Sequence, residues 1–157
     1  MPTDPAFPVR RARVADAAVV AVLLDDFNRE FDTYTPGAEW LTERLSRLLP
    51  GDELAVFLIG EPAAGLAVLS FRPSVWTPGP SVVLDELYVR PEQRNQRLGH
   101  ALLEAACALA AQRGAESLEV NVDGIDVDAR RFYEAHGFSN TEPGETEPMY
   151  FYYRELA

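Results

Sequence analysis

The stretch YVRPEQRNQRLGHALL, residues 88–103, gives the strongest indication of the fold of this chain. A strand-like run stops at Pro91, and an apolar helical repeat begins at Leu98. Three arginines, Arg90, Arg94 and Arg97, lie within eight positions, although the chain has no lysine and a formal net charge of −11. An acidic protein that gathers positive charge at one strand-to-helix junction has a candidate site for an anion there.

The start of a helix strengthens this prediction. Backbone N–H groups of the first turn have no partner within the helix, and the helix dipole favours negative charge beside them. The junction runs from Arg94 to His100, and charges more than about 8 Å away are largely screened at physiological salt. We therefore expect a site for phosphate oxygens. The alternative is that the arginines are solvated or pair with nearby carboxylates such as Glu92.

Length and composition restrict the class of protein. The 157 residues, 47% of them hydrophobic, predict a single globular domain over 1–157. No apolar run approaches the roughly 18 residues of a membrane span, and the N-terminus lacks the apolar core of a signal peptide. We therefore expect a cytoplasmic protein without a membrane partner. The negative charge argues against nucleic acid, and one cysteine with two unclustered histidines predicts no metal site.

Hydrophobic periodicity predicts the order β-α-α-β-β-β-α-β-α-(β)-β. Strands are expected at 7–14, 54–60, 64–72, 81–89, 117–122 and 149–156. Helices are expected after a cap at Asp16, after a cap at Thr35 with Pro36 in the first turn, from Leu98 to Gly114, and over 128–136. This order predicts an α+β protein with α/β-type layers, in which a mixed sheet carries helices on its faces.

Two motifs carry a family resemblance. LDELYVRPEQRNQRLGHALL (84–103) resembles the central signature of the GNAT family of N-acetyltransferases, in which a strand precedes Arg/Gln-x-x-Gly-x-Gly/Ala at a helix start. DVDARRFYEAHGF (126–138) is similar to the family element Asn-x-x-Ala-x-x-Phe/Leu-Tyr-x-x-x-Gly-Phe. The resemblance implies the acyl-CoA N-acyltransferase (GNAT) fold, with a mostly antiparallel, splayed central sheet and helices on both faces.

The resemblance also implies the reaction and its co-substrate. An acetyl group would pass from acetyl-CoA to a primary amine of a small molecule or peptide by direct attack, without a covalent enzyme intermediate. The diphosphate would rest on the amides of 95–100, and the pantetheine arm would pair with 87–89. The expected acetyl-CoA-binding residues are Leu87, Tyr88, Val89, Arg94, Asn95, Gln96, Arg97, Leu98, Gly99, His100, Asp126 and Ala129.

Two of these positions depart from the family pattern. Arg97 stands where the family has its first glycine; we expect a helical backbone there, with a side chain that clamps or flanks the diphosphate. Asp126 stands where the family often has asparagine. Because a carboxylate has no amide donor, Asp126 is expected to cap the helix at 128–136, and direct contact with the coenzyme is the weaker alternative.

Acetyl transfer to an amine needs a base, because an alkyl ammonium with a pKa near about 10.4 must lose its proton before attack. Glu86 is the expected base; strand alternation would place Tyr88 on its face and Asp85 on the other. The alternative is that Glu86 only holds the substrate cation. Tyr133 matches the family tyrosine near the coenzyme sulfur and is the expected general acid, with a role as a core aromatic residue as the alternative.

Other functions and partners remain open at this point. The first two helices carry acidic and aromatic side chains that would suit a cationic amine, or would simply form a polar outer face. The acidic residues are Asp25, Asp26, Glu30, Asp32, Glu39 and Glu43. A non-catalytic acyl-CoA-binding regulatory module and an enzyme for another acyl-CoA donor are alternatives to the acetyltransferase. The predicted strand at 149–156 is either an exposed edge through which a homodimer forms or a core strand.

Overall fold

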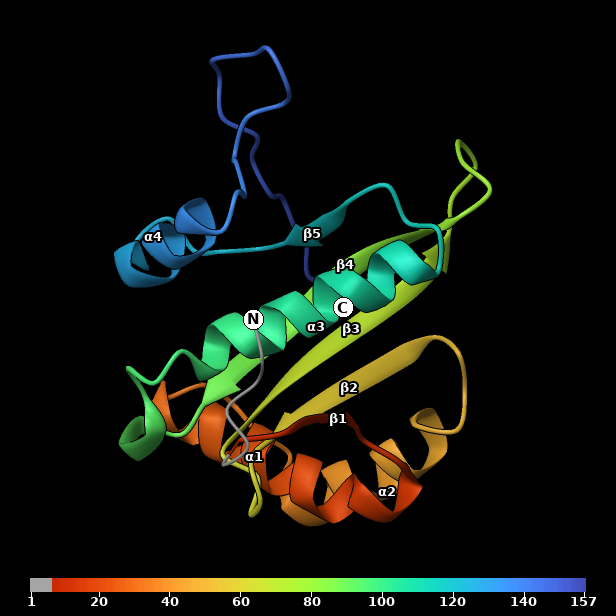
Figure 1. Ribbon diagram of the computed structural model, residues 1–157, viewed down its shortest axis with the longest axis vertical. Coiled ribbons are helices and arrows are strands. Elements are labelled where there is room, and N and C mark those ends of the chain that lie inside the picture. Colours follow the sequence, from red (N-terminus) through yellow and green to blue (C-terminus); the bar gives the residue numbers. More distant parts are fainter. Residues whose placement is uncertain (1–6) are drawn as a thin grey trace. The chain divides into compact units, whose positions relative to one another are not determined.

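A five-stranded sheet in the order β1-β2-β3-β4-β5 organises the first part of the computed structural model, which describes residues 7–157 (Figure 1). The first four strands pair antiparallel and β5 pairs parallel to β4, so the expected mixed, mostly antiparallel sheet is confirmed. The described part of the chain divides into two compact units, 7–120 and 121–157, which are described separately. The strands are β1 (Val9–Arg11), β2 (Leu54–Ile59), β3 (Gly65–Pro73), β4 (Pro80–Val89) and β5 (Leu118–Val120).

Helices cover both faces of this sheet, as expected (Figure 1). α1 (Ala17–Glu30) and α2 (Ala38–Leu48) lie on one face, and α3 (Leu98–Gln112) lies on the other. β2 and β3 are therefore buried on both sides, which explains why they read as continuous apolar runs. The core beneath α1 and α2 joins helix residues to alternate strand residues, among them Val20, Leu23, Leu45, Val56, Leu58, Leu66 and Val68.

One extra residue in β4 changes the phase of that strand. Glu86 lies opposite Val68, whereas Leu84 lies opposite Leu69, so Asp85 is the extra residue of a β-bulge. Adjacent residues of β3 point to opposite faces, and Val68 belongs to the core beneath α1 and α2. Glu86 therefore faces α1 and α2, while Leu84 faces α3.

The two early helices start differently from the prediction. Residues Val14–Asp16 form a 3-10 turn, and the Asp16 side chain does not cap α1. It instead accepts hydrogen bonds from the Arg10 guanidinium and from the Arg13 backbone N–H. α2 begins at Ala38, because the Thr35 hydroxyl is used by Asp25 and by the Gly37 N–H rather than by a helix turn.

The Asp16 contacts give a prediction for stability. They lower the pKa of Asp16 from 3.8 to about 2, with the Arg10 hydrogen bond as the largest cause. A lowered carboxyl pKa stabilises the fold above pH 3.8, and this contribution is lost as the pH falls through about 2. Because Arg10 is half-exposed, Asp16→Asn should lower the free energy of unfolding by only about 1 kcal/mol at neutral pH.

Urea unfolding checks this expectation. The difference between wild type and Asp16→Asn should narrow as the pH falls from about 4 to about 2. A difference that stays constant across this range would show that the charge of Asp16 does not stabilise the fold.

The second unit contains α4 (Val127–Ala135), and its start is as predicted. The Asp126 carboxylate accepts a hydrogen bond of 3.0 Å from the Ala129 N–H, which is the contact of a helix cap. Gly137, at φ +86°, follows the end of the helix. The ring of Tyr133 packs against Phe132 and Phe138 with centroids 5.2 and 5.4 Å apart.

The strand predicted at 149–156 is wrong, and the one predicted at 117–122 is shorter than expected. Residues 149–157 have no regular secondary structure, and their aromatic side chains are exposed. High β-propensity reflects packing on a paired, half-buried surface, so it cannot create a strand where the backbone has no ladder. Among residues 7–157, no helix combines the length and the apolar character that a membrane crossing requires.

Candidate active site

An open backbone edge on β4 is the first element of the candidate site. β5 pairs with β4 only from Val82 to Leu84, so the two strands separate at the bulge. Along a strand, successive residues direct their N–H and C=O groups to opposite sides. The Arg90 N–H donates to Ala64 O on the β3 side, so the backbone groups of Leu87 and Val89 point to the open side.

This open edge can pair with an extended ligand. Donors and acceptors on an exposed strand edge form the same hydrogen bonds with an added strand as with a sheet neighbour. Leu87 and Val89 are two of the three residues at which the sequence predicts pantetheine pairing. Tyr88, the third, is directed by its backbone toward β3, and its side chain lies in the core beneath α1.

Glu86 lies at the start of the open edge, and the pKa of its carboxyl group is raised. The side chain is half-buried, and this desolvation, with a smaller effect of the Asp85 charge, raises the pKa of Glu86 from 4.5 to about 7. Burial also raises the pKa of Asp85, although a hydrogen bond with Ser70 opposes it. A carboxyl group that titrates near neutral pH can both accept and release a proton under physiological conditions.

The register confirms that Glu86 and Tyr88 share a face, because they lie opposite Val68 and Leu66 of the same core. The simple alternation expected for Asp85 does not apply, because Asp85 is the extra residue of the bulge. The bulge therefore aims the Glu86 carboxyl toward the α1 and α2 side, where the sequence places the acceptor.

The turn between β4 and α3 contains two left-handed residues. Asn95 has φ +65° and Arg97 has φ +60°, and α3 begins directly after Arg97. The helical backbone expected at Arg97 is therefore wrong. A left-handed conformation disfavours residues with a side chain, which explains why glycine occupies this position in the family signature.

The first turn of α3 places several backbone N–H groups at the positive end of the helix. The first N–H bonded within the helix is that of Ala101, which donates to Arg97 O. The N–H groups of Leu98, Gly99 and His100 precede it and lie in the first turn. These three residues, with Asn95 to Arg97, are the residues at which the sequence predicts diphosphate binding.

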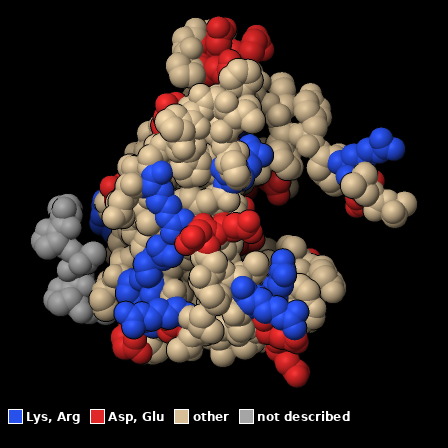
Figure 2. Space-filling view, turned by 90° about the vertical axis from the view of Figure 1, so that its right-hand side faces the viewer, with Lys and Arg blue, Asp and Glu red and all other residues tan. Residues whose placement is uncertain are grey.

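Two of the three junction arginines pair with carboxylates of α1. Arg94 Nη2 contacts both Glu30 oxygens, at 2.9 and 2.7 Å, and Arg90 Nη1 contacts Asp26 at 2.8 Å. The face in Figure 2 shows the same pattern, with arginine side chains lying against acidic ones. The alternative of pairing with carboxylates is therefore realised, but with partners from α1 rather than with Glu92. Arg94 remains a predicted coenzyme ligand through its other donors.

These partners could not be recognised from neighbouring residues. Glu30 and Arg94 are 64 positions apart, as are Asp26 and Arg90. The sequence instead assigned both acids to the acceptor site. Four of the six acidic residues named for that site are ion-paired, which reduces the charge available to a cationic amine. These pairs are Asp25–Arg29, Asp26–Arg90, Glu30–Arg94 and Glu43–Arg47.

The remaining predicted residues belong to the second unit. Tyr133 lies on α4 between its aromatic neighbours, and Asp126 and Ala129 are joined by the helix-cap bond. Because the Asp126 carboxylate is used in this cap, the contact with the coenzyme stays the weaker of its two predicted roles. The roles of Tyr133 and Ala129 stay predictions from the motif.

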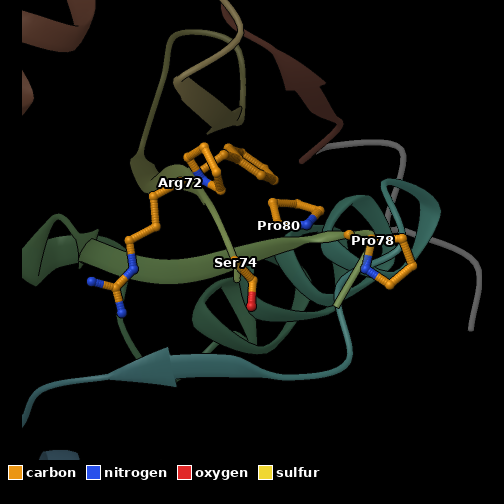
Figure 3. Close-up of a pocket in the computed structure, with 7 residues that line it drawn as sticks. Arg72, Ser74, Pro78 and Pro80 are labelled. Carbon is orange, nitrogen blue, oxygen red and sulfur yellow. The ribbon is translucent and has the colours of Figure 1, made fainter. Parts of the chain in front are cut away.

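An open depression of about 310 Å³ lies elsewhere, on the loop between β3 and β4 (Figure 3). Pro78 and Pro80 form part of its wall, and the Arg72 side chain extends away from them. None of the predicted site residues lines this depression. It stands at the start of β4, whereas the open edge and the amide turn follow the bulge at the other end.

Comparisons with known proteins agree with this geometry. The profile described as "Acetyltransferase (GNAT) family" matches residues 20–138. A curated relative from Bacillus subtilis (strain 168), the uncharacterized N-acetyltransferase YhfO, is 26% identical over 132 residues, which cover 83% of this chain and 88% of the relative.

Solved structures give the same result. The crystal structure of a putative acetyltransferase from Arthrobacter sp. FB24 is 60% identical, with a TM-score of 0.92 over 99% of this chain and 100% of the other. The aminoglycoside N-acetyltransferase AAC(6')-Iy, solved in complex with CoA, has a TM-score of 0.77 at 19% identity and covers 99% of both chains. The second likeness extends to the fold alone.

Proposed function

Since the chain belongs to the acetyltransferase (GNAT) family and is an N-acetyltransferase, we propose that it transfers the acetyl group of acetyl-CoA to an amine of a small molecule, with Glu86 as the base. One observation carries the proposal. A half-buried carboxyl with a pKa of about 7 stands where β4 separates from β5 and its backbone edge opens.

The chain has groups that fit each part of acetyl-CoA. Diphosphate oxygens need several N–H donors in a positive field, and the amides of 95–100, at the positive end of α3, are the proposed donors. The pantetheine arm has amide groups that can bond with the edge at Leu87 and with the Val89 N–H, since Val89 O already accepts a bond from Arg94. The bound thioester would supply an activated acetyl carbonyl.

Glu86 then handles the proton of the acceptor. Above pH 7 its carboxylate can take a proton from the ammonium, directly or through a water molecule, so that the neutral amine attacks the carbonyl. The thiolate that leaves needs a proton in turn, and Tyr133 is its proposed donor. The nitrogen loses its second proton after the attack, and this proton restores Tyr133, while Glu86 releases the first proton to solvent; no bond to the protein forms.

A small-molecule amine is the proposed acceptor class. The solved relative AAC(6')-Iy is named as an aminoglycoside N-acetyltransferase, and aminoglycosides are polyamines. Because four of the six acidic residues are ion-paired within the protein, charge alone is not expected to hold the acceptor. Incubation of the protein with acetyl-CoA and a panel of amines, followed by detection of free thiol, tests the proposal. Coenzyme binding without thiol release for any amine would contradict it.

Acetyl-CoA is proposed as the donor ahead of acyl-CoA compounds that carry an extra carboxylate. An extra carboxylate on the acyl group would need a cationic side chain to bind it, and Arg90 and Arg130 are the candidates in the sequence. Arg90 is paired with Asp26, and Arg130 donates to Gly124 O. The cytoplasmic location and the homodimer stay predictions.

Tyr133→Phe separates catalysis by Tyr133 from a packing role. The substitution keeps the ring and removes the hydroxyl, so kcat should fall about 10²-fold while the Kd for CoA changes little. Steady-state kinetics and calorimetric titration measure the two quantities. A kcat equal to that of the wild type would remove Tyr133 as the acid and leave it as a core aromatic residue.

A further inference from the structure

We propose that Glu30, at the end of α1, is a positioning residue that holds Arg94 against the open edge of β4 and so prepares the junction for the coenzyme. This inference rests on the proposed function, because it concerns the same coenzyme site. Glu30 does not touch the reacting atoms in the proposal; it acts through Arg94.

The contacts of Glu30 join three separate elements. Its side chain is three-quarters buried and accepts bonds from Arg94 Nη2 at both oxygens. Oε1 also accepts a bond of 3.2 Å from the Tyr88 hydroxyl, whose ring stacks on Phe27 with centroids 4.7 Å apart. The last turns of α1 therefore hold both a core residue of β4 and an arginine of the junction.

Arg94 is held on its other side by the backbone. Its Nε donates to Val89 O at 3.0 Å, and its guanidinium lies 5.8 Å from the Tyr88 ring centroid. Val89 O is on the open side of β4, so Arg94 occupies the last acceptor of that edge. An added strand would therefore end at Val89, beside the amides of 95–100.

The same geometry leaves part of Arg94 available. Nε and Nη2 are bonded, and among residues 7–157 the structure gives no partner to Nη1. Glu30 thus fixes a long side chain in one orientation with one donor group left over. A side chain that is already ordered loses less conformational entropy when a phosphate binds.

Glu30→Gln tests the proposal. This substitution has two opposite effects on the affinity for CoA. Loss of the carboxylate frees Arg94 to sample other rotamers, which weakens binding, but it also removes a negative charge near an anion site. Salt screens the second effect and not the first. At about 0.5 M salt we expect the Kd for CoA and the KM for acetyl-CoA to rise about fivefold to tenfold, with kcat at saturation unchanged.

A double-mutant cycle makes the test specific. If Glu30 acts through Arg94, then Glu30→Gln should add little to the loss caused by Arg94→Gln, whereas independent effects would multiply. Glu30→Asp, which restores the charge, should recover part of the affinity. Asp16→Asn, which breaks an ion pair with Arg10 on β1, serves as the matched control and should bind CoA as the wild type does.

The outcomes distinguish this inference from the proposed function. If the wild type binds no CoA, the proposed function fails. If the wild type binds CoA and Glu30→Gln binds equally well or more tightly at high salt, only the positioning role fails. Multiplicative losses in the cycle would also overturn it. Should Glu30→Gln unfold, Arg94→Lys is expected to show the same fivefold to tenfold loss, because a single ammonium cannot bond Val89 O and Glu30 as Nε and Nη2 do. An unchanged Kd for this variant would overturn the positioning role.

Discussion

Replacing Glu86 by glutamine should lower kcat/KM by about 10²-fold or more at pH 8 and remove the rise of the rate through pH 7. The physical reason is the pKa of about 7, since the carboxylate that accepts the proton forms only as the pH rises through this value. Glutamine has nearly the same shape but cannot accept a proton. Initial rates measured from about pH 5.5 to 9 check the prediction.

The neighbouring carboxyl provides a matched control. Asp85 raises the pKa of Glu86 through its charge, so Asp85→Asn should move the rising limb of the pH–rate profile to lower pH. A profile unaltered in Glu86→Gln would show that another group accepts the proton. The remaining candidate role for Glu86 would then be to hold the substrate cation.

The same raised pKa has a consequence for stability. A carboxyl whose pKa is higher in the folded state stabilises the fold below the unfolded pKa of 4.5, and this contribution is lost as the pH rises through about 7. Glu86→Gln should therefore melt at a higher temperature than the wild type at pH 8.5, and at about the same temperature at pH 4.5. A base that lowers stability at its working pH is a trade-off common in active sites.

Replacing Gly79 by alanine should cost about 2–4 kcal/mol of the free energy of unfolding, the largest loss of stability that we predict here. A Cβ at Gly79 would overlap the carbonyl carbon and oxygen of Gly114 and lie 3.2 Å from the Ala115 nitrogen. These are backbone atoms between the end of α3 and β5, so they can give way only if the connection moves. Thermal unfolding should show a melting temperature lower by roughly 5–15 °C.

Gly124→Ala is the control for this substitution. No atom lies within 4 Å of a Cβ built at Gly124, and its φ is not left-handed, so alanine should be neutral or slightly stabilising. If both alanine variants melted at the wild-type temperature, the close approach of Gly79 to Gly114 would not be a feature of the protein in solution.

Several features of the fold could be predicted from residues close together in the chain. The apolar runs of β2 and β3, the repeat of α3 and the cap at Asp126 all depend on neighbours within a few positions. The predicted helix cap at Thr35 was wrong, because a residue distant in the chain uses the same hydroxyl group. Thr35 has a residue type typical of helix caps, yet its hydroxyl is used by Asp25, ten residues earlier.

For the candidate site, too, the sequence predicted the local features and missed those that depend on distant segments. The motif at 84–103 predicted the strand, the amide turn and Glu86 as the candidate base, because strand alternation and helix starts depend on consecutive residues. It did not indicate the bulge at Asp85, since a bulge is defined by the register of the partner strand. Nor did it indicate that α1 would neutralise two of the three arginines.

The order of residues was thus sufficient for the family, the layered α+β fold, the junction before α3 and the identity of the proposed base. Only the folded chain decided which face the Glu86 carboxyl takes, how far its pKa rises, and which arginines keep free donors. The reason is physical: periodicity and capping depend on neighbours a few residues apart, whereas desolvation, strand register and ion pairing depend on segments that folding brings together from as many as 64 positions away.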